Sequence, residues 1–295
     1  MSFSPSPTTA RPAHRRQQRR FQQTQHEHSQ RANPTPDGHF LLLLTSNAQP
    51  MKAFLTLTWT ESKLFLREPA ATFFTLGFPL LLLVAFGAIF GNDPASAPGE
   101  VGYTTYALPG YIALTIGSLG LLSLPITLAT QRDHGILRRF RVTPLRPVTV
   151  LGAQATVHLG MLTGSTLLLG AAAGVGYDVP LPASPLLALT ALVFGGVTFL
   201  AVGFLLGALV PTARAAQAVG MTLFFPMLFL SGAAIPQFLF PDWLRTASVV
   251  LPLTHTTRLL QDAWLHGQWN GTAALVLAGV GIGSTIAATW AFQWT

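Results

Sequence analysis

The segment between residues 131 and 147 groups several charged side chains between two long apolar stretches of this 295-residue sequence. Only 9% of the residues are Asp, Glu, Lys or Arg, against about 25% in ordinary soluble domains. Arg138, Arg139 and Arg141 follow Asp133 within this one segment. This segment is therefore a candidate for binding that depends on charge.

The spacing of the apolar residues in this segment predicts a short surface helix over residues 133–141. Ile136, Leu137 and Phe140, at positions i, i+1 and i+4, would form one apolar stripe on that helix. The arginines would face water or a partner, and Pro144 would help to end the helix. The residues alone leave two interpretations equally open, a positively charged membrane anchor and a docking site for another protein.

Nucleotide, metal and thiol chemistry are not predicted elsewhere in the sequence. The lysines are Lys52 and Lys63, and neither follows a glycine as a phosphate-binding Gly-Lys-Ser/Thr loop requires. The chain has no cysteine, which excludes disulfide bonds and thiolate metal sites, and its histidines show no metal-binding spacing. We therefore predict a chain that is not an enzyme and that binds no metal or cofactor of its own.

Two further groups of titratable residues need positions in the fold. His158 stands alone in a long apolar stretch, where a neutral histidine bonded to a neighbouring helix is favoured over a functional one. His255, Arg258 and Asp262 have the spacing i, i+3 and i+7 of one helix face. They predict either a salt-linked helix cap or the site of a membrane enzyme, and the cap is favoured.

The elements that must position these residues are long and apolar. Six stretches of more than 20 residues contain no Asp, Glu, Lys or Arg, and each is long enough to cross a hydrocarbon core, which needs about 20 residues. We therefore predict an all-α polytopic membrane protein. Its six transmembrane helices are expected near residues 71–90, 107–130, 148–175, 186–210, 216–234 and 271–292.

The distribution of positive charge predicts the orientation of these spans. If the chain changes sides at each span, Arg245 and Arg258 lie on one side. The opposite side then holds Lys52, Lys63, Arg67, Arg132, Arg138, Arg139, Arg141, Arg146 and Arg214. The side with the excess of Lys and Arg faces the cytoplasm, so both termini are predicted to be cytoplasmic.

Two segments outside the spans have a mixed character. Residues 52–68 alternate apolar with charged side chains and predict an interfacial helix, whose polar and aromatic members are Trp59, Glu61, Lys63 and Arg67. Residues 235–267 are too apolar to be fully exposed to water and too interrupted to span the membrane. This predicts a re-entrant or interfacial helix pair. The residues that mark this second segment are Pro236, Trp243, Pro252, His255 and Arg258.

The first fifty residues differ from the rest of the chain. Residues 1–50 are rich in Arg, Gln, Ser, Thr and Pro, a composition that cannot bury a core and predicts a disordered basic extension. Residues 51–295 form the predicted transmembrane domain. Met51, just before the interfacial helix, is the preferred natural start of the protein, and a basic arm for anionic lipid or nucleic acid is the alternative. With Met51 as the start, no nucleic-acid partner is predicted.

The 131–147 segment resembles the signature loop of ABC-2-type permeases, the membrane subunits of ABC exporters, and especially of their daunorubicin-resistance-like multidrug group. It keeps the family's residues at Asp133, Gly135, Leu137, Arg139, Thr143, Pro144 and Leu145. It departs from the family pattern in having Gln131 and Asp133 for two glutamates and Ile136 for a threonine. The segments 108–111, 229–236, 241–244 and 251–254 resemble the same family in the same order.

The resemblance implies a half-transporter that exports a drug-like or lipid-like substrate. A homodimer of this permease would pair with two copies of a separate ATPase that binds ATP and Mg, in the cell membrane (plasma or inner membrane). The coupling helix against that ATPase would comprise Asp133, Gly135, Leu137, Arg138, Arg139, Phe140, Arg141, Thr143 and Pro144. A secondary transporter remains the alternative, although the predicted spans offer no carboxylate for a coupling ion, and a polytopic membrane enzyme ranks below it.

Overall fold

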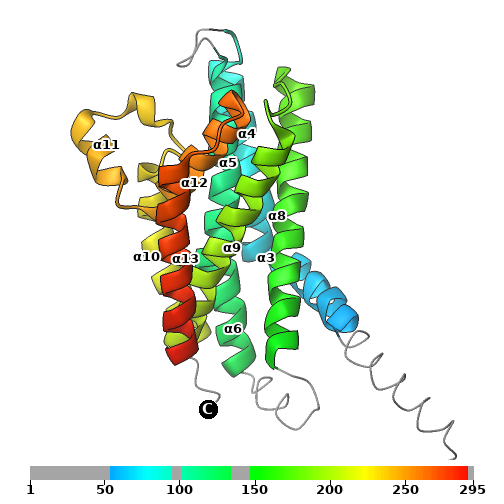
Figure 1. The fold of residues 1–295 in the computed structure, drawn as a ribbon. Coiled ribbons are helices and arrows are strands. Elements are labelled where there is room, and N and C mark those ends of the chain that lie inside the picture. The colour runs from blue at the N-terminus through cyan, green and yellow to red at the C-terminus, as the bar shows by residue number, and fades with distance from the viewer. Residues whose placement is uncertain (1–53, 95–100, 134–146, 292–295) are drawn as a thin grey trace, which may run out of the picture. The chain divides into compact units, whose positions relative to one another are not determined.

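The computed structural model describes residues 54–94, 101–133 and 147–291 (Figure 1). These residues belong to one compact unit, which begins at Phe54; the predicted extension, residues 1–50, lies outside the described residues. A helix covers residues 54–67. The remaining elements are α3 (Pro69–Thr72), η1 (Phe73–Gly77), α4 (Phe78–Phe90), α5 (Tyr103–Ser118), η2 (Leu119–Ser123), α6 (Leu124–Asp133), α8 (Pro147–Tyr177), α9 (Pro185–Leu209), α10 (Ala213–Leu230), η3 (Gln237–Leu239), α11 (Asp242–Ser248), α12 (Pro252–Gln261), η4 (Asp262–His266) and α13 (Gly271–Ala291).

The predicted all-helical membrane fold with six spans is confirmed. Six helical segments are long and apolar enough to cross a membrane: Phe73–Phe90, Tyr103–Asp133, Thr149–Tyr177, Pro185–Leu209, Ala213–Leu230 and Gly271–Ala291. We call them spans 1 to 6. Span 5 ends four residues earlier than predicted, because the chain turns at Gly232, whose φ of +83° suits glycine.

Span 1 contains a π-helical turn, η1, that its proline explains. Pro79 has no N–H, so the carbonyl of Thr75, four residues earlier, cannot receive its usual helical hydrogen bond. The hydroxyl of Ser165 on span 3 donates to that carbonyl instead, at 2.8 Å. A neighbouring helix thus satisfies the backbone group that the proline leaves free, as burial in an apolar medium requires.

Span 2 also has a π-helical turn, η2, close to a proline. Pro125 cannot donate to the carbonyl of Leu121, and this carbonyl faces Gly220 on span 5 so closely that a Cβ on Gly220 would clash with its oxygen. A glycine is therefore required at this crossing of spans 2 and 5.

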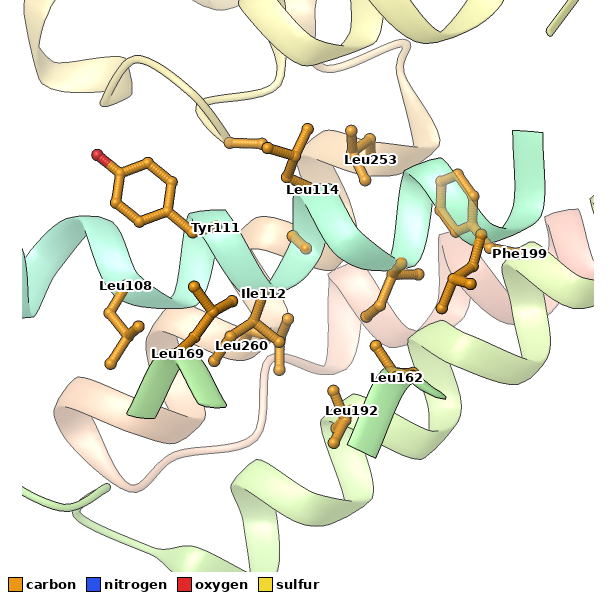
Figure 2. Close-up of a cluster of buried hydrophobic side chains, with 14 of the residues drawn as sticks. Leu108, Tyr111, Ile112, Leu114, Leu162, Leu169, Leu192, Phe199, Leu253 and Leu260 are labelled. Carbon is orange, nitrogen blue, oxygen red and sulfur yellow. The ribbon is translucent and has the colours of Figure 1, made fainter. Parts of the chain in front are cut away.

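Span 2 is the centre of the helical bundle. Its most apolar window is 89% buried, against 17–44% for the other five spans. Figure 2 shows side chains of α5 surrounded by those of α8, α9 and α12. The labelled core residues are Leu108, Tyr111, Ile112, Leu114, Leu162, Leu169, Leu192, Phe199, Leu253 and Leu260.

The two ends of the bundle differ. The helix of residues 54–67 lies oblique to the spans, near the end of the bundle where α6 stops and α8 starts (Figure 1). We call this the loop end, because residues 134–146 connect α6 to α8 there. At the opposite end, α11 stands away from the spans while α12 packs on α5 and α13, so the predicted segment between spans 5 and 6 does contain a pair of helices.

Candidate functional site

Three consecutive residues at the loop end of span 2 contact three different parts of the bundle. Gln131, Arg132 and Asp133 are the last residues of α6, directly before the segment 134–146. We call these three residues, together with Glu61 on the helix of residues 54–67, the junction. The chemistry of each side chain explains the contact that it makes.

Arg132 binds the carboxyl end of span 4. Its Nη1 donates to the carbonyl of Val210 at 3.0 Å, and its Nη2 donates to the carbonyl of Gly207 at 2.9 Å. The last carbonyls of a helix have no intrahelical partner and carry partial negative charge. The fork of a guanidinium can satisfy two of them at once, so Arg132 joins span 2 to the end of span 4.

Asp133 binds the amino end of span 5. Its Oδ2 accepts a hydrogen bond from the backbone N–H of Ala213, the first residue of α10, at 3.1 Å. The first N–H groups of a helix favour a carboxylate. Two adjacent residues of opposite charge therefore match the opposite ends of two consecutive spans.

Gln131 binds the helix of residues 54–67. Its Nε2 donates to Oε1 of Glu61 at 2.9 Å, and Gln131 itself is buried. Burial raises the pKa of the Glu61 carboxyl, an effect that the nearby amides of Gln154 and Gln131 offset in part. The glutamine found where the resembled family has a glutamate thus places an amide donor, rather than a second carboxylate, against Glu61.

The hydrogen bond between Gln131 and Glu61 predicts that Gln131→Glu destabilises the protein. The variant should lose the hydrogen bond and place two carboxylates together, which we expect to cost about 1–3 kcal/mol at a buried contact. The double variant Glu61→Gln/Gln131→Glu reverses the pair and should recover most of the loss. The thermal midpoint of the purified protein measures both, and equal midpoints for the single and double variants would contradict the assigned pairing.

His158 continues the polar contacts from the loop end into the bundle. Its Nδ1 lies 2.8 Å from the carbonyl oxygen of Gln154, and its Nε2 lies 3.2 Å from Oγ of Ser123 in η2. The ring of Phe65, on the helix of residues 54–67, meets the imidazole edge-on with 5.7 Å between centroids. The predicted partner on a neighbouring helix is therefore Ser123, and the histidine also lies between that helix and the π-helical turn of span 2.

The other residues predicted in this region have separate positions. Asp133, predicted as the first residue of a loop helix, is the last residue of α6. Lys63 lies over the ring of Trp59, 4.8 Å from its centroid, and Arg67 is exposed. The residues Gly135, Leu137, Arg138, Arg139, Phe140, Arg141, Thr143 and Pro144 lie outside the described residues.

At the opposite end of the bundle, the structure does not bring His255, Arg258 and Asp262 together through direct bonds. His255 Nε2 lies 2.8 Å from the carbonyl oxygen of Val249. Arg258 donates to Oε1 of Gln237, and Asp262 accepts from Asn270 at 2.7 Å. Nor do residues 54–94, 101–133 and 147–291 hold three His, Asp or Glu residues placed for a metal ion.

The remaining predicted residues of the segment between spans 5 and 6 lie at the starts of short elements. Pro236 precedes η3, and Pro252 is the first residue of α12. Trp243, on α11, is 71% exposed. Gln237 was not predicted as a site residue, yet its amide joins three parts of this segment through Ser231, Ser248 and Arg258.

Comparison with known proteins gives a consistent set of similarities. The family model described as ABC-2 type transporter matches residues 52–265. The probable multidrug ABC transporter permease YbhR of Escherichia coli K12 is 27% identical over 189 residues, which cover 62% of this chain and 51% of YbhR. The chain thus matches about half the length of that relative.

Two further relatives are matched over more of their length. The putative transport permease ycf38 of Porphyra purpurea is 27% identical over 215 residues, with 71% of this chain and 73% of ycf38 covered. The daunorubicin resistance ABC transporter permease protein DrrB1 of Streptomyces coeruleorubidus is 24% identical over 254 residues, with 80% of this chain and 84% of DrrB1 covered.

Proposed function

We propose that this chain, which belongs to the ABC-2 type transporter family, is the membrane-spanning permease subunit of an ATP-driven exporter. The observation that carries the proposal is the junction, where the last residues before the segment 134–146 bind the ends of spans 4 and 5. A force applied to that segment has a direct route, through Arg132 and Asp133, to two other spans.

The partner that applies the force is a separate ABC ATPase, which binds ATP and Mg. It contacts the segment 134–146 and the helix of residues 54–67, whose docking to span 2 depends on Glu61 and Gln131. Two copies of the permease pair with two copies of the ATPase. The arginine-rich loop end faces the cytoplasm of a cell whose plasma or inner membrane holds the complex.

The cargo is an amphiphile of drug-like or lipid-like character, moved outward by alternating access. Support comes from the names of two relatives, a multidrug permease and a daunorubicin resistance permease. The spans are apolar and contain no Asp, Glu, Lys or Arg between residues 149 and 177 or between residues 185 and 209, which suits a cargo without a strong requirement for an ion pair.

The test is assembly with an ATPase encoded beside this chain. We expect the two proteins to purify together, and replacing residues 134–146 by a flexible Gly/Ser linker of equal length should abolish the association. Daunorubicin efflux from proteoliposomes should require ATP and continue in the presence of a protonophore. Association that survives the linker replacement would contradict the docking role. Efflux that needs no ATPase and collapses with the protonophore would contradict ATP coupling.

A further inference from the structure

An open groove runs along the start of span 1 on the outside of the bundle. Its volume is about 530 Å³, and its walls include Leu66, Phe73, Leu80 and, from span 3, Leu168. Leu168 is 43% exposed. The groove is therefore an apolar slot between spans 1 and 3 that faces the surroundings of the bundle.

The length of the slot matches half of a membrane. Its lining extends from Pro69, in α3, to Leu80, in span 1, which is about 17 Å of helix at 1.5 Å per residue. The hydrocarbon core of a bilayer is about 30 Å thick, so the slot covers roughly the apolar depth of one leaflet. Gly77 lies on its floor, and the absence of a Cβ there keeps the slot free beside the ring of Phe73.

A free cation lies at one end of this slot. Arg67, the last residue of the helix 54–67, lines the groove and is exposed. Within residues 54–94, 101–133 and 147–291 the structure gives Arg67 no ion pair and no hydrogen-bond acceptor. Glu68 is not among the lining residues, and burial raises the pKa of its carboxyl group.

We propose that this groove binds an anionic phospholipid, with the phosphate at Arg67 and one acyl chain in the slot between span 1 and Leu168. The chemistry is complementary at both ends. A guanidinium pairs with phosphate through parallel hydrogen bonds, and the apolar lining of the slot offers van der Waals contact to the methylene groups of an acyl chain. The anionic lipids of the cytoplasmic leaflet lie at the level of such a cation. The inference rests on the proposed orientation, with the loop end at the cytoplasmic leaflet, but it does not depend on ATP coupling.

The test compares two lipids that have the same acyl chains and different headgroups. The full-length protein, delipidated in detergent, is titrated with dioleoyl phosphatidylglycerol or dioleoyl phosphatidylcholine, and bound lipid is counted by native mass spectrometry. We expect phosphatidylglycerol to bind at least fivefold more tightly. Arg67→Gln should reduce its affinity to that of phosphatidylcholine, whereas Leu168→Trp, which fills the slot, should weaken both lipids.

The matched control is Lys63→Gln, one turn earlier on the same helix. Lys63 lies over the Trp59 ring and does not line the groove, so its loss should leave the lipid preference intact. Equal affinities for the two lipids in the unmodified protein, or equal losses for Arg67→Gln and Lys63→Gln, would overturn the proposal.

Two further measurements test whether the groove holds another occupant instead, either a second copy of the chain or the transported cargo. The chain has no cysteine, so Leu168→Cys is a unique attachment point. Cross-linking of two copies through this position would assign the groove to a contact between subunits. Displacement of bound phosphatidylglycerol by daunorubicin would assign it to cargo. Either result would overturn the lipid assignment without bearing on the role of the segment 134–146.

Discussion

Arg132→Gln is expected to reduce ATP-driven transport at least tenfold while the protein still inserts and folds. The variant removes the cation that satisfies the terminal carbonyls of Gly207 and Val210. Hydrogen bonds from a charged donor contribute about 1.5–3 kcal/mol each, and loss of about 1.4 kcal/mol from a coupled step already lowers its rate tenfold. Span 4 would then no longer follow the end of span 2. The measurement is transport and ATP hydrolysis by the reconstituted complex.

The control for this prediction is Arg214→Gln. Arg214 lies near the start of α10, is exposed, and has no hydrogen bond or ion pair within the described part of the chain, so its replacement removes a charge of the same sign near the same turn. Arg132→Lys should fall between the two, because an ammonium group keeps the charge but not the planar fork. If both Gln variants lose the same activity, the effect is one of net charge and the capping role of Arg132 is wrong.

The second large effect is expected from Gly203→Val, which should destabilise the protein by about 2–3 kcal/mol or prevent folding. A Cβ at Gly203 would lie 2.6 Å from the carbonyl oxygen of Gly120 and 2.9 Å from Cδ2 of Leu124. The first of these atoms belongs to the backbone of the central span and cannot move aside without shifting the helix. The yield of monodisperse protein and its thermal midpoint measure the effect.

Gly279→Val is the matched control on span 6. A Cβ at Gly279 would meet no atom within 4 Å, so this variant makes the same substitution within a helix without a clash. We expect its thermal midpoint to remain close to that of the unmodified protein. Similar losses for the two variants would show that the close approach of spans 2 and 4 does not account for the need for glycine at position 203.

The spans could be predicted from the sequence because hydropathy and the absence of charge are properties of the local chain. The sequence does not show in the same way which helix each pair of small residues packs against. Gly203/Gly207 and Gly279/Gly283 share the same four-residue spacing, yet the first pair packs on span 2 and the second faces open space. Spacing identifies a surface that permits close contact, whereas which helix fills it depends on the arrangement of all six.

The junction shares only Glu61 and Asp133 with the site residues that the sequence predicts. The arginine-rich segment pointed to the loop end, but Glu61 lies 70 positions before its partner Gln131, and no local pattern indicates such a contact. The sequence predicts Arg132 only as a cytoplasmic charge and Asp133 only as the start of a coupling helix, since their partners are backbone groups at the ends of spans 4 and 5. The π-helical turns lie near Pro79 and Pro125, which leave the carbonyls of Thr75 and Leu121 without a helical donor, and the sequence does not specify the neighbours of those carbonyls.

The central claim, that an ATPase moves the permease through its loop end, is tested most directly by one distance. A spin label attached through Arg214→Cys, in a chain that otherwise has no cysteine, reports the separation of the loop ends of span 5 in the two copies by double electron–electron resonance. Trapping the ATPase with ATP and vanadate should shift this distance distribution, and the shift should be lost when Arg132→Gln is added. An unchanged distance in the trapped complex that retains Arg132 would contradict the account.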